Sequence, residues 1–254
     1  MQSLVYDGSF EGFLCAVFDV YEYKYTDATI YPAIRTIENI FGTTHIVHTN
    51  IGNSDRLWTG LKRKLTVEAQ QHLYRTFLSE LPGIEDHLLH YIQYVFSSPV
   101  FMEQDYSHIA VITITQTAKK VWREKHRMEA FVRFQKTADD LYYAIIEPDY
   151  NVLPLIVVHF KKRYADQRWL IYDAKRKMGI HYDLKEVSEV RLQFTAESAK
   201  GTDVTAVYGE GEEMYQQLWQ QYFKSVNIAA RKNTKLHIQH MPKRYWKYLT
   251  EKKI

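Results

Sequence analysis

A run of short apolar segments between residues 131 and 194 constrains the fold more than any other feature of this sequence. Residues 131–135 and 141–147 are rich in aromatic and β-branched side chains, which is typical of β-strands. The polar residues at 137–140 between them are suited to a tight turn. The first two segments therefore predict a β-hairpin.

The next segment reads as a helix. Asn151 is a good N-cap, and Pro154 is tolerated in a first helical turn. Side chains at helical spacing then share one face, namely Val152, Leu155, Ile156, His159, Phe160 and Arg163. This spacing places His159 and Arg163 together at the far end of a packed surface. A buried strand at 153–158 is the competing interpretation.

Three more strands complete the pattern. Residues 169–173 and 178–182 flank a turn at 174–177, and residues 190–194 alternate apolar with polar side chains. The order is therefore ββαβββ, which predicts an antiparallel sheet with a helix packed on one face. The predicted fold class is α+β.

The N-terminal half begins with a strand at residues 3–6 and a helix capped by Ser9. The helix is predicted by a stripe at the spacing of one helical face, namely Phe10, Phe13, Leu14, Val17, Phe18 and Tyr21. Extended stretches follow at 28–50. Residues 54–97 then show helical signals, with Ser54 or Asp55 as the expected cap. Residues 107–125 carry both strand and helix signals, and we interpret them as one helix.

A polar linker at 198–211 precedes a strong helical pattern at 212–226, and Pro242 opens a short terminal helix. No internal repeat is present. We therefore expect residues 1–254 to form one compact α+β unit, in which the sequence allows a helical insertion at 54–125.

Composition limits the class of protein. The chain has 10 Gly and 6 Pro, which indicates long elements with few tight turns. Cys15 is the single cysteine, so no intramolecular disulfide can form and we expect a reducing compartment. The N-terminus lacks the pattern of a signal peptide, and no apolar stretch is long enough to cross a bilayer. We expect a cytoplasmic protein with no membrane association.

The charge is distributed unevenly although the net charge is only +3. Residues 1–110 hold 7 basic and 13 acidic residues, whereas residues 111–254 hold 26 and 17. The segment 226–254 has 8 basic residues against one acid and includes Tyr245, Trp246 and Tyr248. Such a segment can contact phosphates and stack on bases. A solvated tail with a few core aromatics is the alternative interpretation, and the spacing does not separate the two.

Common catalytic and nucleotide-binding motifs are absent, including the phosphate-binding loop, the dinucleotide fingerprint, the zinc-protease helix and the serine-hydrolase elbow. His87 and His90, beside Glu85 and Asp86, form the most metal-like group. They lack a further ligand at a recognised spacing, so we predict no metal and no cofactor. The remaining acid–base candidates are His126, His159 and Asp173. Candidate anion-binding or polar groups are Arg127, Arg133, Arg163, Arg176, Arg231 and Asn233.

Short segments spread along the whole chain carry a family resemblance. They are residues 6–12, 126–134, 152–160, 169–176, 231–233 and 241–246. With these segments the chain resembles a bacterial family of uncharacterised proteins labelled as DNA metabolism or DNA repair proteins. The resemblance implies the company of a radical S-adenosylmethionine (radical SAM) protein, and related domains occur fused to uracil-DNA glycosylase-like enzymes. With one cysteine this chain cannot bind an iron–sulfur cluster through thiolates, so such chemistry would belong to the partner.

Three functional hypotheses follow. The first is a DNA-binding accessory factor, in which Arg231, Lys232, Lys243 and Arg244 contact phosphate and Trp246 or Tyr245 stacks on a base. The second is an enzyme acting on damaged or modified DNA, with the three acid–base candidates above and with Arg133, Arg163 and Arg176 as phosphate clamps. The third is an interaction module whose main ligand is the radical SAM protein.

Overall fold

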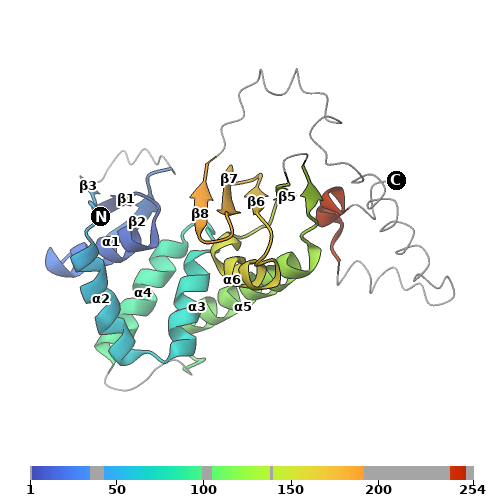
Figure 1. The fold of residues 1–254 in the computed structure, drawn as a ribbon. Helices are drawn as coiled ribbons and strands as arrows, with labels where there is room; N and C mark the ends of the chain where they lie inside the picture. Colours follow the sequence, from blue (N-terminus) through green and yellow to red (C-terminus); the bar gives the residue numbers. More distant parts are fainter. Residues whose placement is uncertain (1, 35–42, 99–104, 138–139, 192–240, 250–254) are drawn as a thin grey trace. The chain divides into compact units, whose positions relative to one another are not determined.

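The computed structural model describes residues 2–34, 43–98, 105–137, 140–191 and 241–249. The chain divides into two compact units, Met1–Trp122 and Arg123–Ile254, which are treated separately below. The class is mixed α+β, as predicted, with a three-stranded parallel sheet in the first unit and a mostly antiparallel five-stranded sheet in the second (Figure 1).

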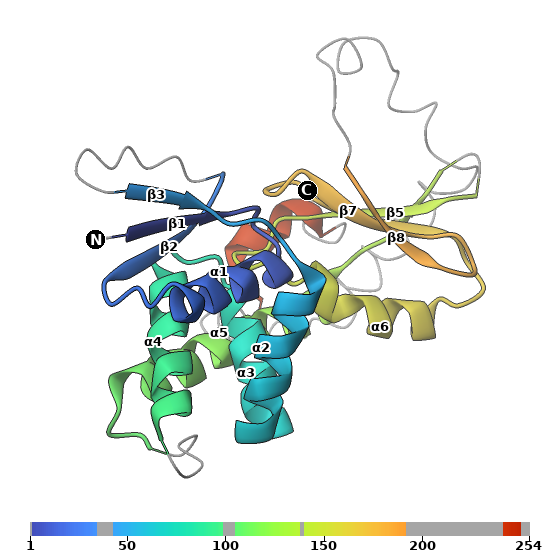
Figure 2. The ribbon, with the colours of Figure 1, turned by 90° about the vertical axis from the view of Figure 1, so that its left-hand side faces the viewer.

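The sheet of the first unit has the order β2-β1-β3, and both neighbours run parallel to the central strand. The strands are β1 (Gln2–Tyr6), β2 (Ala28–Pro32) and β3 (Thr43–Ile46). Helix α1 (Phe10–Glu22) connects β1 to β2 and lies along one face of the sheet (Figure 2). Parallel pairing requires such a crossover, which explains the helix between the first two strands.

Helix α1 forms where the sequence predicts it. The Ser9 side chain accepts a hydrogen bond from the backbone N–H of Gly12, so the predicted N-cap is confirmed. Phe13, Leu14 and Val17 are buried in the core of the unit. The predicted stripe reaches the surface at its C-terminal end, where Tyr21 is 42% exposed.

Helices complete the first unit. They are α2 (Ile51–Lys64), α3 (Val67–Phe77) and α4 (Ile84–Ser97), followed by the first part of α5 (Ile109–Phe131). Helix α2 starts earlier than predicted, because Asn50 rather than Ser54 or Asp55 caps it. A single core joins the sheet to these helices and includes Leu4, Ile30, Leu61, Leu73, Leu88, Ile92 and Ile114.

The segment with mixed signals is helical, as we predicted, and it is longer than expected. Helix α5 continues to Phe131, so the predicted strand at 131–135 is wrong. Only β4 (Gln135–Lys136) remains of it. Good helix formers at 123–130 extend the helix and outweigh the strand preference of the aromatic residues that follow. The predicted helical insertion, residues 54–125, therefore extends past Trp122, where the first unit ends.

The second unit has the predicted ββαβββ order. Its sheet runs β4-β5-β6-β7-β8, with β5 (Tyr142–Ile146), β6 (Trp169–Asp173), β7 (Met178–Tyr182) and β8 (Val187–Val190). The pair β5–β6 is parallel and the other pairs are antiparallel. Strand β8 starts before the predicted segment, most of which lies outside the described residues.

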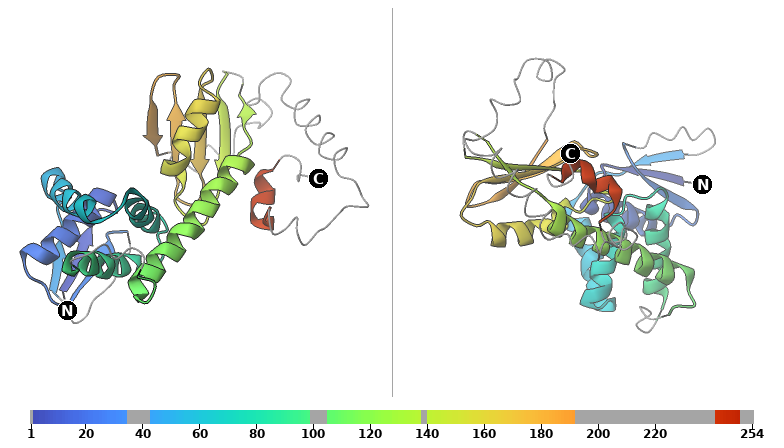
Figure 3. Two further views of the ribbon diagram at one scale, coloured as in Figure 1. Left: turned by 90° about the horizontal axis from the view of Figure 1, so that it is seen from below. Right: turned by 90° about the vertical axis from the view of Figure 1, so that its right-hand side faces the viewer.

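Helix α6 (Leu153–Arg163) is the crossover between the two parallel strands, and the alternative strand at 153–158 is excluded. Val152 takes the N-cap position expected for Asn151. Figure 3 shows α6 lying across one face of the sheet. There the ring of Phe160 meets the fully buried Trp169 with 6.2 Å between centroids.

The 3₁₀-helix η3 (Lys243–Tyr248) follows Pro242, as predicted for a short terminal helix. The predicted helix at 212–226 lies outside the described residues. In the part of the chain that the structure describes, no helix has both the length and the apolar character needed to cross a membrane.

Candidate functional site

A buried carboxylate on α5, Glu124, is the centre of an ion-pair network in the second unit. Its side chain is only 1% exposed. One oxygen accepts a hydrogen bond from the backbone N–H of Asp149 at 3.0 Å, and the other accepts one from Arg244 at 3.0 Å. Arg127 lies 3.6 Å from that second oxygen. Burying a carboxylate is costly without such partners.

Arg244 holds the network together. Its guanidinium also lies 2.8 Å from Asp149 Oδ2 and donates to the hydroxyl of Tyr245 at 2.6 Å. Burial, together with the nearby Glu124 carboxylate, raises the pKa of Tyr245 far above its ordinary value. We call Glu124, Arg127, Asp149, Arg244 and Tyr245 the Glu124 cluster. Within it, two of the predicted phosphate-binding arginines are neutralised by carboxylates.

Asp173, at the end of β6, has no exposed surface. It accepts hydrogen bonds from the backbone N–H groups of Lys175 and Arg176, and the Arg176 guanidinium lies 2.8 Å from its second oxygen. Burial raises the Asp173 pKa above its ordinary value, against the opposing charge of Arg176. Arg176 also donates to the carbonyls of Pro148 and Asp149. This pair anchors the β6–β7 turn to the loop before α6.

The other two acid–base candidates come together on a third carboxylate. Glu129 of α5 lies 3.2 Å from His126 Nδ1 and 3.6 Å from His159 Nδ1, and its Oε1 lies 2.6 Å from Lys125 Nζ. Both histidines remain open to solvent, with side chains 56% and 36% exposed. We call Lys125, His126, Glu129 and His159 the Glu129 cluster. Asp173 belongs to a different set of contacts.

Basic side chains continue from the Glu129 cluster to the end of α6. Lys162 and Arg163 follow His159 by three and four residues and are exposed. Among the described residues, neither has a carboxylate within ion-pair distance. Arg163 lies 5.8 Å from the ring of Tyr164. Arg133 instead donates to the carbonyls of Ala130 and Val132, at the C-terminal end of α5.

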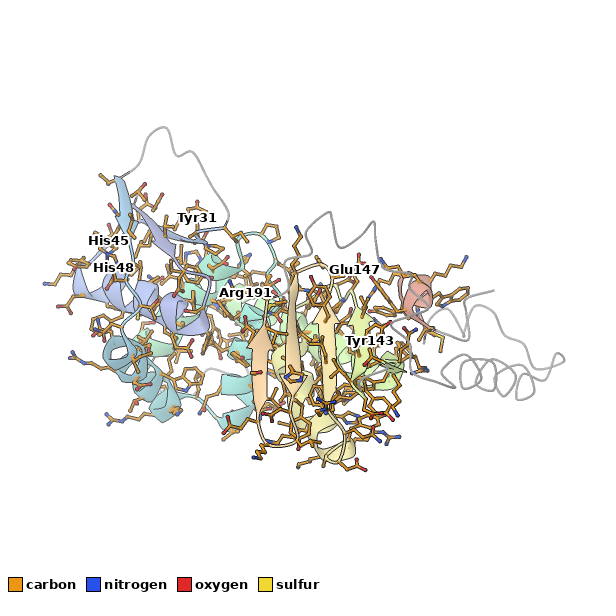
Figure 4. The ribbon with its side chains drawn as sticks, turned by 45° about the horizontal axis from the view of Figure 1, so that its top comes forward. Tyr31, His45, His48, Tyr143, Glu147 and Arg191 are labelled. Atoms are coloured by element: carbon orange, nitrogen blue, oxygen red, sulfur yellow. The ribbon has the colours of Figure 1, made fainter. Side chains whose placement is uncertain are left out.

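The described part of the basic, aromatic C-terminal segment docks through Glu147, which Figure 4 labels at the end of β5. Tyr248 donates to Glu147 at 2.6 Å, and Lys247 forms an ion pair with it. These hydrogen bonds lower the pKa of Glu147. Lys243 is exposed and lies 6.0 Å from the ring of Trp246.

Of the two predicted stacking residues, Tyr245 is buried and Trp246 is partly exposed. The indole N–H of Trp246 donates to the carbonyl of Met241 at 3.0 Å. Three further residues of the predicted DNA contact, Arg231, Lys232 and Asn233, lie outside the described residues.

The first unit holds a separate polar cluster where β1 ends and α1 begins. Asp7 accepts hydrogen bonds from the N–H and hydroxyl of Ser9 and from the hydroxyl of Thr49. Burial alone raises the Asp7 pKa, but these hydrogen bonds outweigh it, and the pKa lies below its ordinary value. Gly12 makes room for the carboxylate, because a Cβ there would lie 2.2 Å from Asp7 Oδ1.

Several potential metal ligands of the first unit bond to other protein groups. His45 Nε2 lies 2.8 Å from Asp19 Oδ2. In the predicted metal-like group, the Asp86 carboxylate accepts a hydrogen bond from the N–H of Ile30 and Glu85 accepts one from Tyr6. Within the described ranges, no group of three or more His, Cys, Asp or Glu side chains could hold a metal ion.

Sequence reasoning did not select the carboxylates that organise these clusters. Glu124 and Arg127 are three residues apart on α5, and Lys125 and Glu129 are four apart, so helical spacing alone could have paired them. The contacts of Asp149 and Glu147 join segments about a hundred residues apart, and no local pattern indicates them.

A comparison with protein families identifies the chain. A family model described as a domain of unknown function, DUF4130, matches residues 82–251, which is more than half of the chain. The chain belongs to the DUF4130 family. The match extends from before α4 to beyond η3, so it includes the Glu124 and Glu129 clusters of this DUF4130 protein. No curated protein matches the chain.

Proposed function

We propose that this DUF4130 protein is a DNA-binding accessory factor in DNA metabolism that works with a radical SAM enzyme. The observation that carries the DNA-binding proposal is the exposed cationic end of α6. Lys162 and Arg163 have no carboxylate partner among the described residues, whereas Arg127, Arg176 and Arg244 are neutralised internally. A cation that is free of carboxylates can exchange its counterions for phosphate.

The surroundings of these two cations favour the same ligand. His159 lies one turn earlier on α6, and His126 of α5 lies beside the same Glu129 carboxylate. Both side chains are partly exposed and can donate further hydrogen bonds to phosphate oxygens. The excess of basic residues after residue 111 would draw the polyanion toward this part of the chain. The resemblance to proteins labelled as DNA repair proteins supports DNA as the polyanion.

Fluorescence anisotropy with labelled single- and double-stranded oligonucleotides, at several salt concentrations, tests the proposal. We expect binding that weakens with salt. The double variant Lys162→Gln/Arg163→Gln should make the plot of log binding constant against log salt concentration less steep, reducing its slope by up to about 2. Each lost phosphate contact removes about 0.7–0.9 from that slope. Lys177→Gln/Arg191→Gln removes one exposed lysine and one exposed arginine elsewhere in the same unit and is the matched control.

The proposal fails if the protein does not bind either oligonucleotide at low salt. It also fails if the two double variants have the same affinity and the same salt slope. In that case the positive charge acts only through its total amount, and the end of α6 has no particular role.

A second candidate function, an enzyme acting on damaged or modified DNA, is favoured by the convergence of His126 and His159 on Glu129. A carboxylate that orients an imidazole is a common feature of general acid–base sites. Oligonucleotides carrying modified bases would be incubated with the protein and analysed by mass spectrometry. We expect His126→Gln and His159→Gln to abolish turnover and to keep the salt-dependent DNA binding that Lys162 and Arg163 provide. If no product forms with any substrate, the enzyme candidate is rejected.

The radical SAM partner is tested separately. The two proteins would be produced together and purified through a tag on one of them, and the complex measured by light scattering. We expect one species with the summed mass. If the proteins elute as two independent species while DNA binding persists, the partner proposal is wrong and the DNA-binding proposal stands.

A further inference from the structure

The surface of the first unit contains an open cavity of about 300 Å³. Its wall is almost entirely apolar, although a cation lies at its rim. The lining residues come from α1, α2 and α4 and are Phe18, Tyr21, Arg56, Leu57, Gly60 and Phe96. We call this cavity the aromatic pocket.

The pocket exists because two sequence features coincide. The apolar stripe of α1 continues past the core, so Phe18 and Tyr21 extend to the surface, where the Tyr21 ring meets Phe96 edge-on at 5.8 Å. On α2, Gly60 has no side chain, and a Cβ at this position would already lie 3.4 Å from the Phe96 ring. A larger residue at position 60 would therefore fill part of the space.

The charged side chains that α2 contributes beside the pocket are two arginines. Arg56 lies 5.7 Å from the centre of the Phe18 ring, and Arg56 and Arg63 are four residues before and three residues after Gly60. They therefore share its side of the helix. In the described part of the chain, neither arginine has an ion-pair partner. Asp55 is exposed but sits one position away, where helical geometry turns it to another face.

We propose that the aromatic pocket binds one large apolar side chain of an acidic segment in a partner protein. The volume lies at the lower end of the range for small-molecule sites, which suits a single anchoring side chain. Interfaces commonly place such an anchor in a pocket, surrounded by polar contacts. The two unpaired arginines complement carboxylates on either side of the anchor.

The chemistry of the wall distinguishes this occupant from a nucleobase. A base carries hydrogen-bond donors and acceptors on its edge, and an apolar wall would leave them unsatisfied at a cost of roughly 1–3 kcal/mol each. An aromatic or aliphatic side chain has no such groups. The aromatic pocket is therefore a binding site for a protein partner on the first unit. It is independent of the proposed DNA contact on α6.

Nuclear magnetic resonance of the full ¹⁵N-labelled chain provides the test, with three blocked pentapeptides as probes. Their sequences are Glu-Glu-Phe-Glu-Glu, Glu-Glu-Ala-Glu-Glu and Lys-Lys-Phe-Lys-Lys. The proposal expects the first peptide to shift the amide signals of Gly60 and Tyr21 and to bind at least about tenfold more tightly than the other two, because both the anchor and the charge contribute.

Variants of the chain locate the contact. Gly60→Leu should abolish the shifts because it fills the pocket, and Arg56→Gln/Arg63→Gln should weaken binding by about two- to tenfold, the range for exposed ion pairs. Lys62→Gln is the control and should bind the acidic Phe peptide normally. The Lys62 ammonium lies over Trp58, which is not part of the pocket lining. The exposed arginine variants keep the test decisive if Gly60→Leu does not fold.

Three results would overturn the proposal. The first is equal binding of the acidic and basic Phe peptides. The second is a larger Gly60 shift with thymidine monophosphate than with the acidic peptide, which would assign the pocket to a nucleobase. The third is a dimer in light scattering that Gly60→Leu dissociates, which would make a second copy of this chain the occupant. Each result leaves the α6 oligonucleotide experiment unaffected.

Discussion

Replacing Glu124 with Ala should destabilise the second unit by about 3–5 kcal/mol, the range for removing one partner of a buried ion pair. The change leaves the N–H of Asp149 and the guanidinium of Arg244 without the acceptor they share. Because the Arg244 side chain is 41% exposed and water can solvate it, the lower part of this range applies. Glu124→Gln keeps one acceptor oxygen and loses the charge, so it should cost about 1.5–3 kcal/mol.

Urea unfolding followed by tryptophan fluorescence would measure the loss, and hydrogen exchange would locate it. We expect faster exchange at η3 and in the loop before α6, the two segments that Glu124 joins to α5. Glu189→Ala removes an exposed carboxylate that lies 3.3 Å from Arg191 and should cost at most about 1 kcal/mol. If Glu124→Ala costs no more than this control, or if exchange at η3 is unchanged, the cluster does not hold the C-terminal helix in place.

Three further predictions concern the first unit. Because the folded-state pKa of Asp7 is lowered, its contribution to stability is complete above about pH 3.8 and is lost as the pH falls through the folded-state pKa. The loss of unfolding free energy in Asp7→Asn, measured in urea, should therefore become smaller below about pH 3.8. Gly12→Ala should lower the stability of the unit in thermal unfolding, because its Cβ would lie 2.2 Å from the Asp7 carboxylate. Gly60→Ala should be neutral or stabilise by up to about 1 kcal/mol in the same measurement, because alanine favours the helix and its Cβ would lie 3.4 Å from the Phe96 ring. Thr76→Val should cost about 1 kcal/mol in urea unfolding because the buried hydroxyl donates to the carbonyl of Ile114.

The elements that the sequence predicts well are those with a strong local signal. The stripe from Phe10 to Val17 and the Ser9 cap specify α1, because burial and capping both follow from residues within one helix. The strands at Trp169–Asp173 and Met178–Tyr182 were predicted with these same bounds, since turn residues separate two apolar runs.

Strand partners and strand direction are determined by contacts between distant segments. Nothing near Leu4 indicates that it lies between Ile30 on one side and His45 on the other in a parallel sheet. The parallel pairing of β5 with β6 likewise depends on how α6 returns the chain across the sheet. At residues 131–135 the local strand preference was misleading, because α5 continues through Phe131.

The candidate site was predicted in part. Two of the three acid–base candidates, His126 and His159, both contact Glu129. The sequence could not show that Asp173 and Arg176 would be enclosed together, since burial is a property of the packed unit. The sequence did not predict the aromatic pocket either, because its wall combines residues of three helices, α1, α2 and α4.

The limits of the DUF4130 match do not coincide with the limits of a compact unit. The match begins at residue 82, before α4, whereas the first unit ends at Trp122. Helix α4 buries Leu88, Ile92 and neighbouring side chains in a core whose other side is built from residues before the match. A fragment cut at the family boundary would expose this apolar face to water and would tend to aggregate. A soluble minimal fragment should therefore be sought near Arg123, by trimming inside α5, rather than at the edge of the family match.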